Sequence, residues 1–459
     1  MRGTPLEEVA RVIGARLVGA RVGRTVRGVC IDSRRAGPDE LFFALRGRVD
    51  GAEYAGDALA RGAVAVVASR PVEGPTLVVD DPLDALQRLA RWSIETWEPE
   101  PPVVVGITGS VGKTTTKDAL AAILRTAGRH VTATGGNYNN EIGLPLTVLS
   151  ANESSEVMVL EMGATHEGDI AHLCRIAPPQ VGVLTAIAPV HLDTFGSIEG
   201  IARGKGELAR SLPDDGVMVA PVGVPPAAIA EGRNLRRRIT FGRERQEGVD
   251  LWASEVREGP EGLGFRMHLG SQSVRVCSPV FGTHLVQPLL AATGGALALG
   301  LSLEECAAGL SRVKRTGLRG EVYRLRGDIV LYDDTYNASP AAMQAVLRYA
   351  RSQAGEQGRR CVAVLGGMYE LGLWAREYHR EIGRLADELG FDLLVCVGDE
   401  ARWYAEGFSG EVVPCGDVEE AYGVLEERLE DGDYVVVKGS RGVGLDALTR
   451  RLRESLAVV

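Results

Sequence analysis

Residues 102–128 combine a β-branched apolar run, a glycine loop and a helical segment, and this combination restricts the fold more than any other part of the chain. The stretch reads PVVVGITGSVGKTTTKDALAAILRTAG, with apolar residues at helical spacing after the loop and Gly128 as a typical helix stop. A strand that enters a helix through such a loop presents backbone N–H groups and the positive end of the helix dipole to an anion. The stretch therefore predicts a phosphate-binding loop on a parallel sheet, with an ordinary tight turn as the alternative.

One residue of this loop departs from the general phosphate-loop pattern, which has a glycine six positions before its lysine. Counting back from Lys113 leads to Ile107. The rest of the pattern is intact, since Lys113 can reach the β and γ phosphates and the Thr114 hydroxyl can bind Mg²⁺. The departure indicates a variant of the loop rather than its loss.

Strands and helices alternate along the chain in two blocks, which predicts an α/β fold with open parallel sheets. The second block is expected to place apolar strands within 328–340, 359–368, 392–400 and 433–442. A proline-rich segment, EPEPPV, separates the first block from a smaller α/β region at the N-terminus. We expect domains at 1–84, 101–313 and 314–459, with a linker helix at 85–100.

The composition restricts the partners and the compartment. The net charge is −10 and no apolar run reaches the length of a membrane span, so neither nucleic acid nor membrane insertion is expected. The seven cysteines are scattered without a CxxC pair, as in reduced cytoplasmic proteins. The first residues fit a capped helix rather than a targeting segment, with Thr4 as N-cap, Pro5 at the first helical position and Glu7 completing a capping box. We therefore expect a cytoplasmic protein.

Six further motifs follow the loop in order, and together with TGSVGKTT they resemble the Mur ligase superfamily. They are GNYNNEIGLPLTVL (136–149), LEMGATHEGDI (160–170), HLDTFGSIEGIARGKGEL (191–208), YDDTYNASPAAM (332–343), LGGMYELG (365–372) and VKGSRG (437–442). The segment at 30–63, which begins CIDSRRAGPDELFF, is similar to the family's uridine-nucleotide-binding domain. The resemblance spans nearly the whole chain, and the loop of this family also lacks the glycine missing at Ile107.

The resemblance implies three domains: a small N-terminal α/β domain that binds a uridine nucleotide, a central P-loop domain with a parallel sheet that binds ATP, and a C-terminal Rossmann-like α/β domain that closes on ATP and binds an incoming dipeptide. It is most specific to the branch that adds D-alanyl-D-alanine to UDP-MurNAc-tripeptide through an acyl phosphate. That reaction releases ADP and phosphate and supplies UDP-MurNAc-pentapeptide for peptidoglycan synthesis. We expect a monomer with ATP and two Mg²⁺ ions as cofactors.

Two other functions stay open at this point. One is a paralogue that forms a different amide bond, and the other is a non-catalytic nucleotide-binding module. The third residue of the tripeptide, lysine or diaminopimelate, also stays open.

The same resemblance assigns roles to individual positions. The ATP site is expected to comprise Gly109, Ser110, Val111, Gly112, Lys113, Thr114, Thr115, Asn137, Asn140, His284, Arg319, Asp334, Tyr336 and Asn337. The catalytic residues are expected to be Lys113, Glu161, His191 and Lys205, and the Mg²⁺ ligands Thr114, Glu161, His191 and Lys205. UDP-sugar binding is expected at Asp32, Ser33 and Arg34, and dipeptide binding at Lys438, Ser440 and Arg441. In this family the lysine at the position of Lys205 is carbamylated by CO₂, which turns a cation into an anionic metal ligand.

The chemistry explains why cations must gather at such a site. A carboxylate and the γ-phosphate of ATP repel each other by about 4 kcal/mol at about 4 Å and an effective dielectric of about 20. Lys113 and two Mg²⁺ ions would offset this repulsion. The attacking α-amine has a pKa of about 7.7–8.0 and needs no strong base. Taken singly, the same side chains also fit structural roles: a strand-end carboxylate at Glu161, a structural histidine at His191, a surface lysine at Lys205 and a surface salt bridge at Asp32.

Three segments depart from the family's pattern. Leu285 and Gln287 stand where asparagines follow the histidine matched by His284, which leaves the recognition of adenine open. Ala186 and Gly367 replace a common asparagine and a frequent aspartate. None of these departures touches the four expected catalytic residues.

Overall fold

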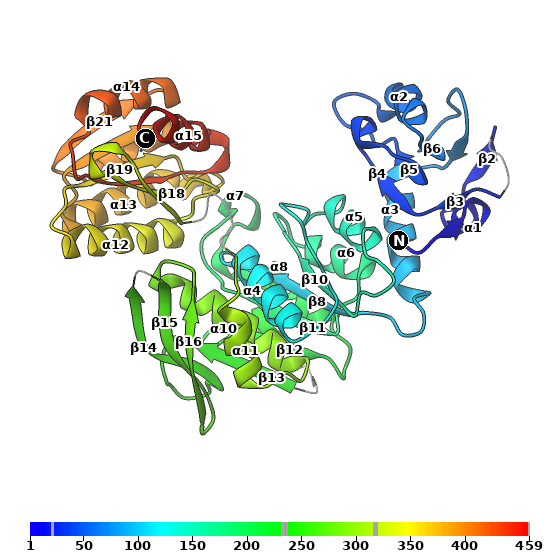
Figure 1. Ribbon diagram of the computed structural model, residues 1–459, viewed down its shortest axis with the longest axis horizontal. Helices are drawn as coiled ribbons and strands as arrows, with labels where there is room; N and C mark the ends of the chain where they lie inside the picture. The colour runs from blue at the N-terminus through cyan, green and yellow to red at the C-terminus, as the bar shows by residue number, and fades with distance from the viewer. Residues whose placement is uncertain (20–22, 231–234, 236, 260, 315–319, 458–459) are drawn as a thin grey trace.

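The chain forms three lobes, each built around its own sheet (Figure 1). The computed structural model describes residues 1–19, 23–230, 235, 237–259, 261–314 and 320–457. Within these ranges, no helix combines the length and the apolar character needed to cross a membrane. The α/β fold class expected from the sequence is confirmed.

A five-stranded sheet in the order β2-β7-β6-β5-β4 centres the N-terminal lobe. Strands β4 to β7 are parallel, and β2 runs antiparallel to β7. The elements of this lobe are β1 (Thr4–Pro5), α1 (Leu6–Val12), β2 (Arg16–Val18), β3 (Thr25–Val26), β4 (Gly28–Cys30), η1 (Ser33–Arg35), β5 (Glu40–Phe43), η2 (Gly51–Tyr54), α2 (Ala55–Ala60), β6 (Ala65–Ala68), β7 (Thr76–Val78) and α3 (Pro82–Glu95).

The predicted capping box at the N-terminus is wrong. Thr4 and Pro5 form strand β1 and pair with β3, and α1 begins at Leu6 without a side-chain cap. Glu7 accepts a hydrogen bond from the Gly23 amide at 2.7 Å instead. The backbone of Thr4 is extended and paired with β3, so this residue cannot take the position of a helix N-cap.

Helix α3 connects the N-terminal and central lobes and packs one face against both. Asp81 caps it by accepting a hydrogen bond from Leu83 N at 2.8 Å, and Pro82 takes the first helical position. Its buried face includes Leu86 and Leu89, which belong to one hydrophobic cluster shared by both lobes. The N-terminal lobe is therefore joined to the central lobe by a packed helix.

A nine-stranded sheet in the order β16-β15-β14-β13-β12-β11-β8-β10-β9 centres the middle lobe. Strands β8 to β14 are parallel as predicted, but β14, β15 and β16 form an antiparallel extension that the sequence reading did not identify. The elements are β8 (Val103–Thr108), α4 (Lys113–Thr126), β9 (Val131–Ala133), α5 (Gly143–Leu149), β10 (Val157–Glu161), α6 (Asp169–Ile176), β11 (Val181–Leu184), α7 (Leu192–Phe195), α8 (Ile198–Lys205), α9 (Glu207–Ser211), β12 (Val217–Pro221), η3 (Pro226–Ile229), β13 (Arg237–Gly242), β14 (Leu251–Gly259), β15 (Gly262–Leu269), β16 (Gln272–Ser278), η4 (Thr283–Leu285), α10 (Val286–Ala298) and α11 (Leu303–Leu310).

A six-stranded sheet in the order β17-β18-β22-β19-β20-β21 centres the C-terminal lobe, with only β17 antiparallel. Separate hydrophobic clusters cover its two faces. The elements are β17 (Glu321–Arg324), η5 (Arg326–Asp328), β18 (Val330–Asp334), α12 (Pro340–Glu356), β19 (Cys361–Gly366), η6 (Gly372–Trp374), α13 (Ala375–Leu389), β20 (Leu393–Val397), η7 (Glu400–Glu406), β21 (Glu411–Cys415), α14 (Val418–Arg428), β22 (Tyr434–Lys438), η8 (Arg441–Val443) and α15 (Leu445–Ser455).

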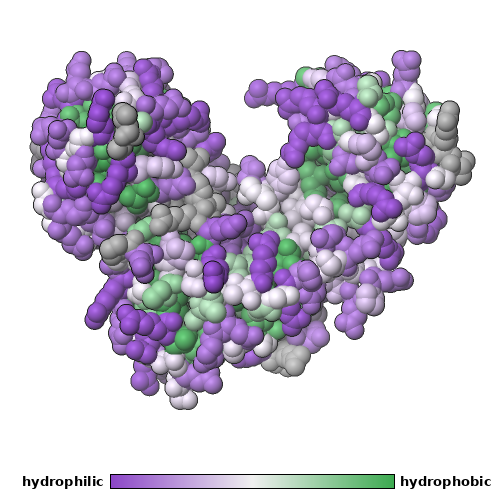
Figure 2. All heavy atoms as spheres, viewed as in Figure 1, coloured by the Kyte–Doolittle hydropathy of each residue, from purple (hydrophilic) through white to green (hydrophobic). Residues whose placement is uncertain are grey.

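The carboxyl ends of two sheets open onto one cleft. Loops after β8, β10 and β11 line it from the central lobe, and loops after β18, β19 and β22 line it from the C-terminal lobe. Open α/β sheets bind ligands at this edge. A hollow also separates the N-terminal and C-terminal lobes above the central one (Figure 2). The fold thus leaves room for a substrate that reaches from one outer lobe toward the other.

Candidate active site

The cleft between the central and C-terminal lobes has a volume of about 970 Å³ and gathers most of the expected site residues. Those that line it are Ser110, Val111, Gly112, Lys113, Thr114, Thr115, Asn137, Asn140, Glu161, His191, His284, Asp334, Tyr336, Asn337, Lys438, Ser440 and Arg441. Gly109 and Lys205 lie behind this lining, and Asp32, Ser33 and Arg34 lie in the N-terminal lobe. Arg319 falls outside the described residues.

The loop after β8 has the shape that its glycines predict. Gly109 and Gly112 take φ of +143° and +83°, and a Cβ on Gly109 would collide with Thr185 Oγ1. Helix α4 begins directly after Gly112, so its amino end faces the cleft. Lys113 Nζ donates to the Gly109 carbonyl at 2.7 Å, which holds the ammonium against the loop.

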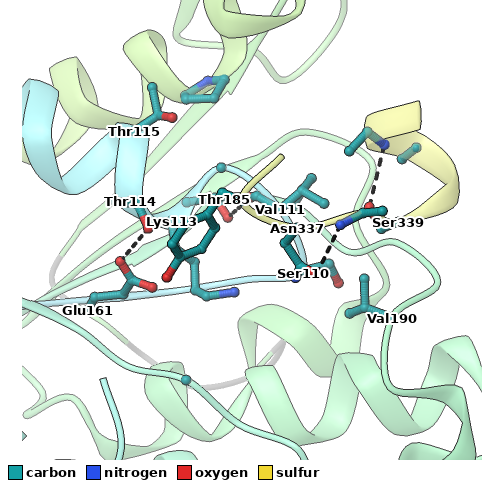
Figure 3. A pocket seen from close by; sticks show the side chains of 18 of the residues that line it. Ser110, Val111, Lys113, Thr114, Thr115, Glu161, Thr185, Val190, Asn337 and Ser339 are labelled. Atoms are coloured by element: carbon teal, nitrogen blue, oxygen red, sulfur yellow. Dashed lines mark hydrogen bonds between the residues drawn. The ribbon is translucent and has the colours of Figure 1, made fainter. Parts of the chain in front are cut away.

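Thr114 and Glu161 point toward each other in the same corner (Figure 3). The Thr114 hydroxyl donates to Glu161 Oε2 at 2.8 Å, and Asn139 Nδ2 donates to Glu161 Oε1 at 2.8 Å. Glu161 is buried at the end of β10, so both oxygens of its carboxylate are held in place. Two of the predicted Mg²⁺ ligands are thereby brought into direct contact.

The three asparagines at 137–140 make different contacts. Asn139 is the side chain that contacts Glu161. Asn140 Oδ1 instead accepts hydrogen bonds from Ile142 N and Gly143 N at the start of α5. Asn137 lines the cleft. Three asparagines in four residues gave no signal that could have separated these positions.

Lys205 is buried at the end of α8, which excludes the surface lysine considered from the sequence. Its ammonium donates to the Ala164 carbonyl at 2.9 Å and lies 5.2 Å from the centre of the Phe195 ring. Burial, and then the charge of Lys113, lowers the pKa of Lys205 to about 7. A substantial fraction of this amine is therefore neutral near pH 7.

His191 and Glu370 meet across the boundary between the two lobes. The Nδ1 atom of His191 lies 2.5 Å from Oε2 of Glu370, and this contact lowers the pKa of the Glu370 carboxyl. Both residues have a left-handed backbone, with φ of +50° and +64°. Sequence reasoning identified His191 but missed Glu370, although Glu370 lies within the LGGMYELG motif.

On the C-terminal wall, Lys438 braces the loop after β18. Its ammonium donates to Asp334 Oδ2 at 2.6 Å and to the Asn337 carbonyl at 2.7 Å. The Ser440 hydroxyl accepts from Tyr369 N at 2.9 Å, whereas Arg441 is exposed and lies 3.4 Å from Asp446. Lys438 is thus engaged within its own domain, and Arg441 extends its guanidinium into solvent at the cleft.

His284 lines the cleft from η4. Burial lowers its pKa to about 4, and its buried Nδ1 has no hydrogen-bond partner among the described residues. Gln287 Nε2 donates to the Thr185 carbonyl at 3.4 Å, so it supports the loop after β11. Leu285 adds an apolar side chain to the same part of the cleft.

The triplet expected to bind the UDP-sugar forms a turn in the N-terminal lobe. Asp32 Oδ1 accepts from Arg34 N at 3.1 Å, and Arg34 Nη2 lies 2.8 Å from Asp32 Oδ2. Ser33 is buried. The geometry is that of the turn with a surface salt bridge, which the sequence allowed as an alternative.

Known proteins resemble this chain over its whole length. Three family models match successive parts of it: the Mur ligase family catalytic domain at 25–91, the Mur ligase middle domain at 107–296 and the Mur ligase glutamate ligase domain at 318–441. The UDP-N-acetylmuramoyl-tripeptide–D-alanyl-D-alanine ligases of Bacillus subtilis and Escherichia coli are 34% and 30% identical to it, over 98% and 99% of both sequences.

Two crystal structures have a similar fold. MurF from Acinetobacter baumannii superposes with a TM-score of 0.88 at 29% identity, covering 99% of both chains. MurF from Thermotoga maritima in complex with ADP gives a TM-score of 0.81 at 30% identity, covering 94% of this chain and 97% of that one.

Proposed function

Because the chain belongs to the Mur ligase family, we propose that it joins D-alanyl-D-alanine to UDP-MurNAc-tripeptide at the expense of ATP. The similarity to ligases of this specificity covers the full length, including the domain that would select the dipeptide. The observation that carries the chemistry is the corner where the Thr114–Glu161 pair lies beside the phosphate loop of Lys113. This corner can bind an anionic phosphate and the cations that neutralise it.

The oxygen ligands of this corner suit Mg²⁺. Thr114 supplies a hydroxyl and Glu161 a carboxylate, and Asn139 orients that carboxylate from behind. In the described part of the chain, no cluster of three or more carboxylate, histidine or cysteine side chains could hold an ion alone. Mg²⁺ usually shares its ligands with substrate phosphates, so the two ligands found here are sufficient for such a role. When bound, the ion would supply positive charge to the transferring phosphate.

The chain's own residues define the rest of the reaction. The ammonium of Lys113 would face the β and γ phosphates and reduce their repulsion of the substrate carboxylate. Transfer of the γ-phosphoryl group to that carboxylate gives an acyl phosphate and ADP. The α-amine of the dipeptide then attacks the acyl carbon and releases phosphate. Positioning and charge stabilisation account for these steps, and we assign no general base.

Lys205 would enter this site after modification. Its neutral amine can react with CO₂ to form a carbamate with loss of one proton, which replaces a cation by an anion. Two observations support this proposal. The pKa of Lys205 is lowered, and its buried ammonium contacts Ala164, a residue that lines the cleft. The carbamate would then join Thr114, Glu161 and His191 as ligands of two Mg²⁺ ions.

The substrates would occupy different lobes. The UDP-sugar would bind in the N-terminal lobe near Asp32, Ser33 and Arg34, and the dipeptide carboxylate near Ser440 and Arg441. ATP would lie between the phosphate loop and the C-terminal residues Asp334, Tyr336 and Asn337, with its base near His284. We further propose that the protein is a monomer, that it acts in the cytoplasm and that it does not bind nucleic acid.

Release of ADP tests this function. We expect ADP to form with UDP-MurNAc-tripeptide, ATP, Mg²⁺ and D-alanyl-D-alanine, and to stop when either the tripeptide substrate or the dipeptide is omitted. Turnover with a different amine but not with the dipeptide would indicate a paralogue. Binding of ATP without turnover under any of these conditions would indicate a non-catalytic module.

A further inference from the structure

Loops from two different domains meet at His191. The 2.5 Å contact between Nδ1 and Glu370 Oε2 pairs a ring of the central lobe with a carboxylate of the C-terminal lobe. His191 immediately precedes α7, Glu370 lies between β19 and η6, and both residues line the reaction cleft. Figure 1 shows α7 at the boundary of these lobes.

The central domain fixes the histidine side of this contact. The His191 carbonyl accepts hydrogen bonds from Thr194 N at 3.2 Å and Phe195 N at 3.0 Å. The Thr194 hydroxyl also bonds to the Thr165 carbonyl, and Leu192 and Phe195 are buried in a core of the central lobe. A left-handed backbone at a non-glycine residue persists only where its surroundings hold it, so the central domain sets the position of His191.

The C-terminal domain fixes the carboxylate side. On the residues before Glu370, Met368 N donates to His379 Nε2 and Tyr369 N donates to Ser440 Oγ, both at 2.9 Å. The residue after it, Leu371, is 2% exposed within the core of the C-terminal lobe. The Glu370 carboxylate is therefore presented by a loop that is rigid within its own domain.

The two loops also approach each other through their backbones. Gly372 has φ of +56°, and a Cβ on it would lie 3.2 Å from Cα of Asp193. Segment η6 packs against α7 at this point. The side chains of His191 and Glu370 are 25% and 53% exposed, and an ion pair of that exposure adds little stability. The contact therefore fixes the relative position of the two side chains and contributes little to the stability of the fold.

We propose that Glu370 is a positioning residue for the ligase reaction: it fixes the ring of His191 from across the domain boundary, and only when the C-terminal domain is docked. The inference rests on the proposed function. A carboxylate on one ring nitrogen fixes the orientation of the ring and selects the tautomer. Among the described residues, Nε2 of His191 has no hydrogen-bond partner. It is therefore the ring nitrogen available to bind a phosphate or a metal ion. Docking of the C-terminal domain thus fixes the ring orientation of His191 in the central domain.

A graded set of variants tests this role. Glu370→Ala removes the acceptor, and Glu370→Gln keeps an amide oxygen that can accept from Nδ1–H but loses the charge. We expect Glu370→Ala to lower kcat about 10- to 100-fold, Glu370→Gln to lower it less, and the KM for UDP-MurNAc-tripeptide to stay unchanged in both. Glu377→Gln is the matched control, because Glu377 pairs with Arg380 within α13 of the same domain.

A second measurement needs no turnover. Long-range ¹H–¹⁵N spectra of the histidine side chains, assigned with His191→Asn, report which ring nitrogen carries the proton. In ligand-free protein we expect the His191 signals to change in Glu370→Ala and to keep their wild-type positions in Glu377→Gln. We also expect the double variant Glu370→Ala/His191→Asn to be no slower than His191→Asn alone.

Wild-type kcat together with wild-type His191 signals in Glu370→Ala would overturn the proposal. Additive losses in the double variant would overturn it as well, because Glu370 would then act independently of His191. The wild-type protein could show no dipeptide-dependent turnover while the His191 signals still depend on Glu370. That result would contradict the proposed function but would leave the positioning of His191 by Glu370 supported.

Discussion

Two buried lysines lie at opposite walls of the cleft, Lys438 in its lining and Lys205 behind it, and they are held in different ways. Lys438 of the C-terminal lobe donates to the Asp334 carboxylate at 2.6 Å and to the Asn337 carbonyl at 2.7 Å. Lys205 of the central lobe donates only to the Ala164 carbonyl among the described residues, and burial lowers its pKa to about 7. A buried charge needs an opposite charge beside it, and of these two lysines only Lys438 forms an ion pair.

This difference separates the roles of the two walls. The C-terminal wall uses its lysine to brace the loop that contains Asp334 and Asn337, so its charge supports structure. The central wall keeps an amine that is costly to bury and free to react. Proteins retain such costly groups at functional sites, so the chemistry is expected on the central wall and the support on the C-terminal one.

Lys113→Ala should give the largest effect, because it removes the cation that we propose to face the phosphates. We expect kcat to fall at least about 10³-fold, in the range seen when a transition-state charge donor is lost. Affinity for UDP-MurNAc-tripeptide should change little, because the site proposed for the UDP end is in another lobe. ADP release and calorimetric titration measure the two quantities, and a comparable loss of both would count against this domain assignment.

Lys438→Met should lower the free energy of unfolding of the C-terminal lobe, because it leaves the Asp334 carboxylate without its cationic partner. We expect a loss of about 3 kcal/mol in the free energy of unfolding, at the low end for a broken buried pair. The Asp334 side chain is 16% exposed, so water can relieve part of the cost. Urea titration measures it, and Asp334→Asn/Lys438→Met should recover part of the loss. An unchanged midpoint would mean that the brace contributes nothing.

Lys205→Met should act in the opposite direction and stabilise the fold in CO₂-free buffer. The pKa of Lys205 is about 7 in the folded protein and 10.5 in the reference state, so between these values the unfolded chain binds a proton that the folded protein does not. The contribution of Lys205 to stability therefore rises with pH across this window and is least favourable below pH 7. We expect a gain of a few kcal/mol at pH 7, with about 5 kcal/mol as the upper limit set by the pKa shift, and it should largely disappear by about pH 10.

Urea titrations of the wild type and of Lys205→Met at several pH values test this sign. Lys438→Met is the control, since its lysine is paired. A destabilised Lys205→Met protein at pH 7 would show that the ammonium of Lys205 is well solvated or paired, and the contrast between the two lysines would be lost. The same variant should be inactive as a ligase if Lys205 takes part in the reaction.

Asn139→Ala should have the smallest effect of the four. It removes a neutral donor from Glu161 Oε1 while Thr114 keeps its hold on Oε2. We expect a loss of about tenfold in apparent Mg²⁺ affinity, from loss of a residue that only orients a ligand. Activity measured against Mg²⁺ concentration checks it, with Asn140→Ala as the neighbouring control. Equal effects at both positions would indicate a general disturbance of the loop.

Local structure is predicted best from the sequence where a local residue pattern alone determines the backbone. The strand, glycine loop and helix at residues 103–126 form as expected because the glycines of the loop are the residues that tolerate its backbone. The N-terminal capping box failed because a tertiary pairing of Thr4 and Pro5 with β3 overrode a local signal. The alternation of strands and helices on either side does not predict the antiparallel strands β14 to β16, although burial alternates along parts of each strand.

Contacts between domains are beyond such patterns. His191 and Glu370 are separated by 178 other residues and meet only because two lobes dock. The burial of Lys205 likewise depends on Phe195 packing into the space that Gly204 leaves open. Motifs can place such residues in loops at a sheet edge, but only the assembled structure shows which charges are paired and which are left available.

The fate of the substrate's carboxylate oxygen tests the account most directly. UDP-MurNAc-tripeptide labelled with ¹⁸O in its acceptor carboxylate would be converted with ATP and D-alanyl-D-alanine, and the released phosphate analysed by mass spectrometry. Activation of this carboxylate as an acyl phosphate predicts one ¹⁸O atom in each phosphate and the other in the new amide. Unlabelled phosphate, released together with pentapeptide product, would contradict it.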